Sequence, residues 1–216
     1  MTFLSQGFEC FPNQFSDAEC RTVVDHLNEI EQIGTRCLLD QSWCQTLAAD
    51  VQRKLITTLP QLSGLRVIQC TYFNKSIDDN WLVAFHQDRS IPVSDRVSHN
   101  YAGHSRKEGM TFVHGPDSLL SQMIALRLHL DDSTLENGPL RVLPGTHCHG
   151  TLSQERIQHL RQTIEEDALA IAKGGIIALS PLLLHASSKS LITEPRRVLH
   201  FLFGPIDLPD GLVWRK

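Results

Sequence analysis

Apolar positions recur at helical spacing in two segments near the start of the chain. The first segment begins with a capping box at Ser16, and its apolar positions repeat every three or four residues until Gly34. The second runs from about Gln41 to Leu59 and stops before Pro60, which cannot continue a helix. The pattern predicts two amphipathic helices that pack against a neighbouring sheet.

From Leu65 onward the pattern changes to short apolar segments rich in β-branched and aromatic residues, as expected of strands. An Asn-Gly turn at Asn137 predicts a hairpin between the segments on its two sides. One short amphipathic helix, from Ser153 to about Glu166, interrupts the series. The predicted strands are Arg66–Phe73, Leu82–Phe85, Met123–Leu130, Leu140–Leu143, Ala168–Ala172, Ile176–Leu184 and Arg197–Phe203.

Many short strands preceded by helices predict a mainly β protein with flanking helices, whose core is a two-sheet sandwich or jelly roll. Helices do not alternate with strands and the sequence has no glycine-rich phosphate loop, so a doubly wound α/β fold is not expected. The length of 216 residues fits a single domain. We expect residues 1–64 to form a helical support, residues 65–205 the β core, and residues 90–115, which lack a clear period, a lid.

Composition and charge argue against several classes of function. A net charge of -4 with no basic stripe disfavours nucleic-acid binding, and no apolar run is long enough to span a bilayer. No secretory signal is visible, and the six cysteines form no Cys-x-x-Cys pair, so we expect reduced thiols and a cytoplasmic protein. The expected partner is a small-molecule substrate, and the sequence makes no prediction of oligomeric state.

The candidate chemistry begins with the triplet His86-x-Asp88, whose two side chains project from the same face of a strand. Such a triplet is common by chance. A second histidine would complete the two-histidine, one-carboxylate set that leaves three positions open on a ferrous ion. His185 ends an apolar segment, and Arg196 follows eleven residues later at the start of another. An antiparallel return between these two strands would bring His185 and Arg196 close together.

The order and spacing of these residues match those of Fe(II)- and 2-oxoglutarate-dependent oxygenases. Two segments, Asn137 to His147 and Asn80 to Asp88, resemble the phytanoyl-CoA dioxygenase-like family of these enzymes. The resemblance extends over roughly residues 65–205. It implies a double-stranded β-helix, which is a cupin-like jelly roll, and an enzyme that uses Fe(II), 2-oxoglutarate and O2.

The resemblance also implies roles for particular side chains. Arg196 would pair with the distal carboxylate of 2-oxoglutarate, since a guanidinium matches a planar carboxylate with two parallel hydrogen bonds. Ser187 would donate a hydrogen bond to the same carboxylate, and Asn74 occupies a position that contacts the co-substrate in some members. The implied metal ligands are His86, Asp88 and His185.

The substrate is expected to be a small organic molecule, because no basic cluster suited to the phosphates of CoA is visible. Arg127 and Arg141 are substrate-binding candidates if strand alternation aims them inward, and His147 could line the mouth of the site. The intact Asp88 favours hydroxylation of an aliphatic carbon, with release of succinate and CO2, over halogenation. Two alternatives stay open: a non-catalytic jelly-roll module that binds a metal or ligand, and a metal-dependent hydrolase.

Overall fold

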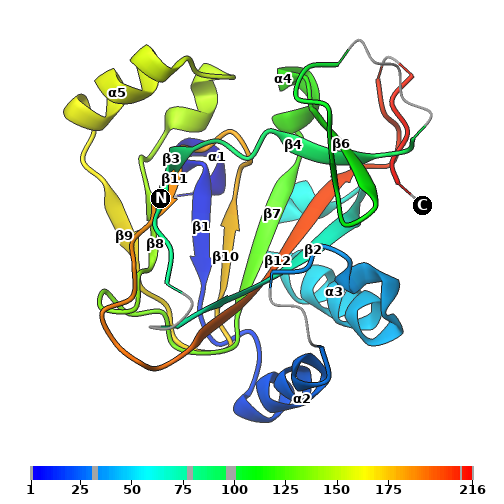
Figure 1. Ribbon diagram of the computed structural model, residues 1–216, viewed down its shortest axis with the longest axis vertical. Helices are drawn as coiled ribbons and strands as arrows, with labels where there is room; N and C mark the ends of the chain where they lie inside the picture. Colours follow the sequence, from blue (N-terminus) through cyan, green and yellow to red (C-terminus); the bar gives the residue numbers. More distant parts are fainter. Residues whose placement is uncertain (1, 31–33, 77–79, 96–100, 210, 216) are drawn as a thin grey trace.

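Two antiparallel sheets form the core of the protein in a computed structural model that describes residues 2–30, 34–76, 80–95, 101–209 and 211–215 (Figure 1). The larger sheet has the strand order β1-β10-β7-β12-β2, and the smaller sheet has the order β3-β11-β8-β9. All neighbouring strands in both sheets are antiparallel. This arrangement confirms the predicted mainly β fold with a jelly-roll core and flanking helices.

The described residues form the following elements. The α-helices are α1 Phe3–Gln6, α2 Asp17–Asn28, α3 Ser42–Leu55, α4 Asp117–Leu120 and α5 Gln154–Thr163, and the 3-10 helices are η1 Leu38–Asp40, η2 Pro60–Leu62 and η3 Thr146–His149. The strands are β1 Phe8–Phe11, β2 Leu65–Lys75, β3 Val83–His86, β4 Ser90–Val93, β5 Ser105–Lys107, β6 Met110–His114, β7 Ile124–His129, β8 Leu140–Val142, β9 Asp167–Leu169, β10 Ile176–Leu179, β11 His185–Ser187 and β12 Arg196–Pro205.

Helices α2 and α3 cover the outer face of the larger sheet, as the two predicted amphipathic helices should. Ser16 caps α2: its hydroxyl accepts a hydrogen bond from the amide of Glu19, whose carboxylate accepts one from the Ser16 amide. The apolar stripes of both helices share a core cluster with alternate residues of the sheet, such as Leu126 of β7 and Phe201 of β12. The outer face of the larger sheet is therefore buried under α2 and α3, and its inner face is turned toward the smaller sheet.

Two further apolar clusters complete the core. One lies on the inner faces of the two sheets and includes Ala125 and Leu202 of the larger sheet and Leu140 and Val142 of the smaller. The other packs α5 against the outer face of the smaller sheet. Both sheets are therefore backed by helices (Figure 1).

The predicted hairpin around Asn137 is wrong. Strand β7 pairs with β10 and β12 in the larger sheet, whereas β8 pairs with β11 and β9 in the smaller one. The turn therefore carries the chain from one sheet to the other. The segment Ile176–Leu184 behaves similarly: β10 ends at Leu179, and β11 begins at His185 in the opposite sheet, because Pro181 interrupts the pattern between them.

The structure predicted for two segments of the chain also needs correction. Residues 90–115 contain β4, β6 and β5, which form a three-stranded antiparallel sheet, so this segment is not irregular where it is described. Nearly every residue of β6 is buried, which hides the alternation that would have revealed it. Residues 1–64 are more than a helical support, since β1 is an edge strand paired with β10.

Candidate metal and co-substrate site

His86 and His185 lie directly opposite each other on the adjacent antiparallel strands β3 and β11, although they are far apart in the sequence. Their ring centroids are 4.3 Å apart. Asp88 reaches both rings: Oδ1 lies 3.4 Å from Nε2 of His86, and Oδ2 lies 3.5 Å from Nε2 of His185. The three ligand atoms lie within 4.8 Å of one another, so the structure brings together the three residues predicted to bind iron.

Backbone carbonyls fix the orientation of both imidazole rings. Nδ1 of His86 lies 2.9 Å from the carbonyl oxygen of Ala84, and Nδ1 of His185 lies 2.9 Å from that of Leu183. A carbonyl only accepts, so each Nδ1 carries the ring proton, and each Nε2 turns a lone pair toward Asp88. Two lone pairs and a carboxylate facing one another repel unless a cation lies between them.

The donor set fits a divalent transition metal. Ligands about 2.1 Å from a metal and at right angles to each other are about 3 Å apart, close to the 3.4 Å and 3.5 Å separations observed. Burial lowers the pKa of His185 to about 4, which keeps this ring neutral at pH 7. Burial opposes ionisation of Asp88, but His185 and His86 in their protonated forms attract the carboxylate and hold its pKa well below the usual range.

Gln87, between the two candidate ligands in the sequence, anchors this segment. Its amide nitrogen donates to the carbonyl oxygens of Gly150 and Leu182 at 2.8 Å and 2.7 Å, and its amide oxygen accepts from the backbone nitrogen of Leu152 at 2.9 Å. The three bonds leave little freedom to the backbone that carries the imidazole and the carboxylate. This positioning role could not be predicted from the sequence, because it depends on loops distant along the chain.

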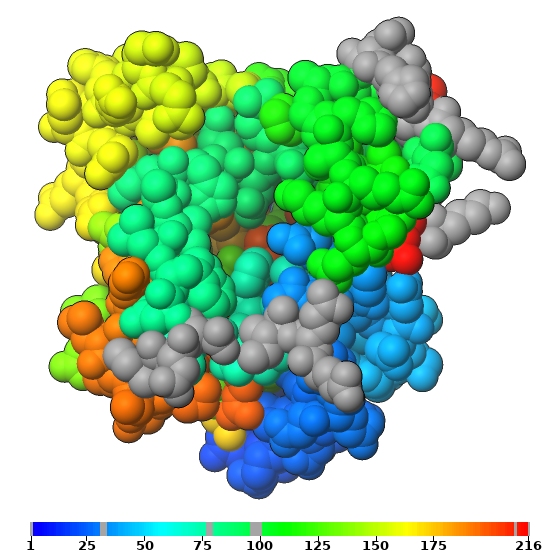
Figure 2. Space-filling model, viewed as in Figure 1, coloured from blue at the N-terminus to red at the C-terminus, as the bar shows by residue number. Residues whose placement is uncertain are grey.

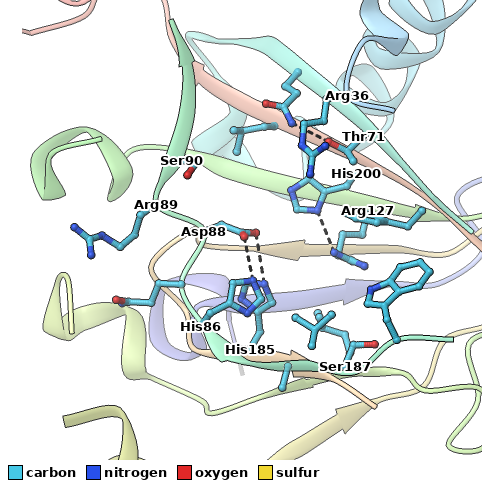
Figure 3. Close-up of a pocket in the computed structure, with 18 of the residues that line it drawn as sticks. Arg36, Thr71, His86, Asp88, Arg89, Ser90, Arg127, His185, Ser187 and His200 are labelled. Carbon is cyan, nitrogen blue, oxygen red and sulfur yellow. Dashed lines mark hydrogen bonds and ion pairs between the residues drawn. The ribbon is translucent and has the colours of Figure 1, made fainter. Parts of the chain in front are cut away.

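The three residues line a cavity of about 360 Å³ between the two sheets, a size typical of small-molecule sites. Figure 2 shows a hollow over this region, bordered by atoms of the teal and green segments, and Figure 3 shows the side chains inside it. Strands β2, β7 and β12 supply one wall, and β3 and β11 supply the other. Lys107 and Phe112 from the three-stranded sheet also line it.

Two buried cations converge on Ser187 within the cavity. Arg196 is 3% exposed; Nε donates to the carbonyl oxygen of Asn137 at 3.1 Å and Nη2 to Oγ of Ser187 at 3.4 Å. Lys75 is 1% exposed, and its Nζ donates to the same Oγ at 2.9 Å and to the carbonyl oxygen of Ser188 at 2.7 Å. Neither pairs with a carboxylate among the described residues.

Both groups carry charge at neutral pH. Burial, with a smaller effect of nearby arginines, lowers the pKa of Lys75 to about 8 and that of Arg196 to about 10. A buried charge with no partner of opposite sign is costly, so this end of the cavity is suited to an anionic ligand.

Lys75 was not predicted, and its neighbour Asn74 was predicted in its place. On β2 the residues that line the cavity alternate along the strand, and they include Thr71, Phe73 and Lys75. Asn74 therefore projects from the opposite face of the sheet, where its Oδ1 is buried with no hydrogen-bond partner among the described residues. Asn74 does not line the cavity, so the structure does not bring it to the predicted co-substrate position.

The Asn137-Gly138 turn holds this end of the cavity together. The carbonyl oxygen of Asn137 accepts from Arg196, and that of Gly138 accepts from the Ser187 hydroxyl at 3.0 Å. Gly138 has φ 71, and a Cβ at this position would collide with the carbonyl oxygen of Ser188. Because the Ser187 hydroxyl donates its proton to the carbonyl oxygen of Gly138, its oxygen accepts hydrogen bonds from Lys75 and Arg196. This differs from the prediction that Ser187 donates a hydrogen bond to the co-substrate.

Two of the predicted substrate residues lie outside the cavity. The guanidinium of Arg141 pairs with the carboxylate of Glu166 at 2.8 Å, because the alternate residues of β8 face the interior. Nε2 of His147 lies 3.3 Å from the carbonyl oxygen of Leu4, so this ring packs against the N-terminal segment. Neither residue lines the cavity, and both predictions are wrong.

The third predicted substrate residue, Arg127, does line the cavity. Alternation along β7 aims it inward, where it is 8% exposed, and Nη1 lies 3.1 Å from Nδ1 of His200 on β12 (Figure 3). The sequence did not indicate a role for His200. Its position in an apolar strand, between Leu199 and Phe201, resembles that of an ordinary core residue.

A double-stranded β-helix with two histidines and an aspartate facing an enclosed cavity is the architecture of iron- and 2-oxoglutarate-dependent oxygenases. The sequence profile of the phytanoyl-CoA dioxygenase (PhyH) family matches residues 3–198, and the chain belongs to this family of dioxygenases. The predicted family is therefore confirmed. Comparison by sequence with curated proteins finds no match.

Solved structures of similar fold support the architecture. HygX from Streptomyces hygroscopicus, with nickel and 2-oxoglutarate bound, is 17% identical, with a TM-score of 0.67 over 94% of this chain and 85% of HygX. The carbocyclase SnoK from nogalamycin biosynthesis is 12% identical, with a TM-score of 0.72 over 99% of this chain and 83% of SnoK. EctD from S. alaskensis, with iron bound, is 16% identical, with a TM-score of 0.66 over 94% of this chain and 74% of EctD.

A membrane-spanning helix is not found in the part of the chain that the structure describes: none of its helices is both long and apolar enough to cross a bilayer.

Proposed function

We propose that this protein is an Fe(II)- and 2-oxoglutarate-dependent dioxygenase that hydroxylates an aliphatic carbon of a small organic substrate. One observation carries the proposal: a two-histidine, one-carboxylate set faces the same cavity as Lys75 and Arg196, two buried cations that pair with no carboxylate among the described residues. A metal-dependent hydrolase or a metal-binding module has no need for this second, cationic feature.

His86, Asp88 and His185 are the residues that would hold the iron. In the metal-bound form, two neutral imidazoles and one carboxylate would leave Fe(II) with a net positive charge. When bound with 2-oxoglutarate, iron of this type supplies the activation of O2, coupled to decarboxylation of the co-substrate to succinate and CO2. The contribution of the protein is to hold the donor atoms and to keep bulk water away.

Arg196 and Lys75 would bind the distal carboxylate of 2-oxoglutarate. The guanidinium has free N–H groups beyond the two that bond Asn137 and Ser187, and it offers the planar geometry that a carboxylate prefers. Lys75 adds a second charge from the next strand, since Lys75 and Arg196 are opposite each other in the register of β2 and β12. Ser187 orients both cations through its Oγ.

We also propose that residues 1–216 act as one domain in which the sheet of β4, β6 and β5 covers the cavity. Lys107 and Phe112 of that sheet line the cavity, and Glu108 pairs with Arg36 at 3.0 Å, which ties the cover to the N-terminal part of the chain. The six cysteines are all free, which supports a reducing compartment such as the cytoplasm.

Hydroxylation is the specific outcome to test. HygX has been solved with hygromycin B bound, and two similar structures are a carbocyclase and an epimerase, so related folds support several oxidations of small molecules. A product that carries one added oxygen atom supports hydroxylation. A product that has lost two hydrogens, with no oxygen added, would contradict hydroxylation and indicate ring closure or desaturation.

The proposal is tested by formation of succinate from 2-oxoglutarate under air with Fe(II), with and without a panel of small organic compounds. We expect succinate formation in the wild type and its loss in His86→Ala. His159→Ala is the matched control, because His159 is exposed on α5, and it should retain the activity. A wild type that binds Fe(II) but not 2-oxoglutarate would contradict the proposal and favour a hydrolase or a binding module.

A further inference from the structure

The cavity contains a second cationic position that is distinct from Lys75 and Arg196. In the register of the larger sheet, Arg196 is opposite Lys75, whereas His200 is opposite Thr71 on one side and Arg127 on the other. His200 is four positions beyond Arg196 along β12, so their backbone positions are about 13 Å apart at the rise of a strand. The two pairs are therefore separate features of one wall.

Most of the hydrogen-bonding capacity of Arg127 is unused. Nη1 contacts Nδ1 of His200, while Nε is buried with no hydrogen-bond partner among the described residues. The guanidinium lies over the ring of Phe73, 5.4 Å from its centroid, and no carboxylate of the described residues pairs with it. Such a group is suited to an oxyanion, which can accept two parallel N–H bonds from it.

His200 adds a donor beside the guanidinium. A guanidinium cannot accept a hydrogen bond, so Nδ1 of His200 must accept from Arg127, and the ring proton is on Nε2. Burial, and then the charge of Arg127, lowers the pKa of His200 to about 3, which keeps the ring neutral. Nε2 has no partner among the described residues, and the ring lines the cavity (Figure 3).

The net charge of the groups that line the cavity also favours an anionic substrate. When iron and 2-oxoglutarate are both bound, the charge of the dication cancels that of the dianion. Asp88 then offsets only one of the three buried cations Lys75, Arg127 and Arg196, which line the same cavity. Among the described residues, two positive charges therefore remain in the cavity, and a negatively charged substrate would reduce that excess.

We propose that Arg127 and His200 bind a carboxylate of the substrate, which is therefore an organic acid. The inference rests on the proposed function and specifies its substrate class. The other possible source of a carboxylate is the keto-acid end of 2-oxoglutarate itself. Its five carbons span only about 5 Å with C–C bonds of about 1.52 Å. The spacing along β12 joins backbone positions and does not exclude this source, so the experiment below distinguishes the substrate from the co-substrate.

Matched pairs of small acids and their neutral amides test the proposal: benzoate with benzamide, phenylacetate with phenylacetamide, and hexanoate with hexanamide. The protein is first loaded anaerobically with Fe(II) and saturating 2-oxoglutarate, whose own binding is titrated beforehand. Calorimetric titration then gives the Kd of each probe. We expect at least one acid to bind at least tenfold more tightly than its amide in the wild type.

Single-residue variants identify which side chain causes the preference for an acid over its amide. Arg127→Met should abolish the acid-to-amide ratio, Arg127→Lys should retain part of it, and Arg156→Met, at an exposed arginine on α5, should leave it unchanged. If no acid is preferred by a wild type that binds 2-oxoglutarate, the inference is overturned and the proposed function stands. A preference that persists in Arg127→Met, with weakened 2-oxoglutarate binding, also overturns it and assigns Arg127 to the co-substrate. Failure of 2-oxoglutarate to bind the wild type would overturn both proposals.

Discussion

The two sheets that enclose the cavity contribute different chemistry. The smaller sheet supplies His86 from β3 and His185 from β11, and Asp88 lies two residues beyond the end of β3. The larger sheet supplies the cations Lys75, Arg127 and Arg196. The candidate metal ligands and the candidate anion-binding groups thus stand on opposite walls.

The difference follows from how each wall is supported. Strands β2 and β12 have 11 and 10 residues, and the outer face of their sheet is packed against α2 and α3. This extensive apolar packing offsets the unfavourable free energy of burying several charges on the inner face. Strands β3 and β11 have only 4 and 3 residues, and Asp88 is 34% exposed beyond the end of β3. Substitutions on the two walls should therefore have separable effects.

The largest expected effect belongs to the smaller sheet. Asp88→Ala removes the carboxylate that faces both imidazoles, and we expect the Kd for Fe(II) to rise by more than about 100-fold, since loss of a group that only orients a ligand already costs 10- to 100-fold. Anaerobic titration with Fe(II) measures this. Asp167→Ala, at an exposed carboxylate on β9, is the control. Iron affinity within tenfold of the wild type would remove Asp88 from the metal site.

The next effect tests the larger sheet. Arg196→Met should raise the Kd for 2-oxoglutarate by about 10- to 100-fold, because a charged hydrogen bond contributes about 1.5–3 kcal/mol. Arg196→Lys should recover only part of the loss, since an ammonium cannot form two parallel bonds to a carboxylate. Fe(II) affinity should stay within about threefold of the wild type. Equal losses of iron and 2-oxoglutarate affinity would contradict the division of roles between the sheets.

A smaller, pH-dependent effect belongs to Lys75. Its pKa is lowered to about 8, so Lys75 is charged below that pH and becomes neutral as the pH rises through it. The affinity for the 2-oxoglutarate dianion should therefore be constant below pH 8 and fall above it. In Lys75→Met the affinity should be about tenfold lower at pH 7 and should not change between pH 7 and pH 9. Lys173→Met, at a residue outside the cavity lining, should retain the wild-type profile.

The smallest effect concerns the support behind the larger sheet. Ser16→Ala removes the N-cap of α2 and should lower the free energy of unfolding by about 1 kcal/mol. Urea unfolding followed by circular dichroism gives this value. Binding of 2-oxoglutarate should be unchanged, because the cap does not touch the cavity. A loss of binding without a loss of stability would show that α2 acts on the site directly.

The sequence sufficed for the parts of the site that depend on short-range geometry or on motif order. His86 and Asp88 share a face because they are two residues apart, and His185 and Arg196 were identified by their spacing. The expected antiparallel return between the latter two is wrong, since β11 and β12 belong to different sheets. Ser187, on β11, bridges the gap by accepting a hydrogen bond from Arg196 at 3.4 Å.

What the sequence left undetermined depends on strand phase and on sheet membership. Asn74 was named from the family resemblance alone, and a shift of one residue moves a side chain to the other face of a strand, where Lys75 lines the cavity. Arg141 was misplaced because the residues on either side of it on β8 face the interior, and His147 because it lies on η3 and packs against the N-terminal segment. His200 acquires its role only beside Arg127, a pairing that the register of β7 and β12 creates.

The most direct test of the division between the two walls is a crystal structure of the protein with Fe(II) and 2-oxoglutarate, grown without O2. The account predicts an anomalous iron peak within coordination distance of His86, Asp88 and His185. It also predicts the distal carboxylate of 2-oxoglutarate between Arg196 and Lys75, with Arg127 not bonded to the co-substrate. A metal bound elsewhere, or a co-substrate whose distal carboxylate contacts Arg127, would contradict it.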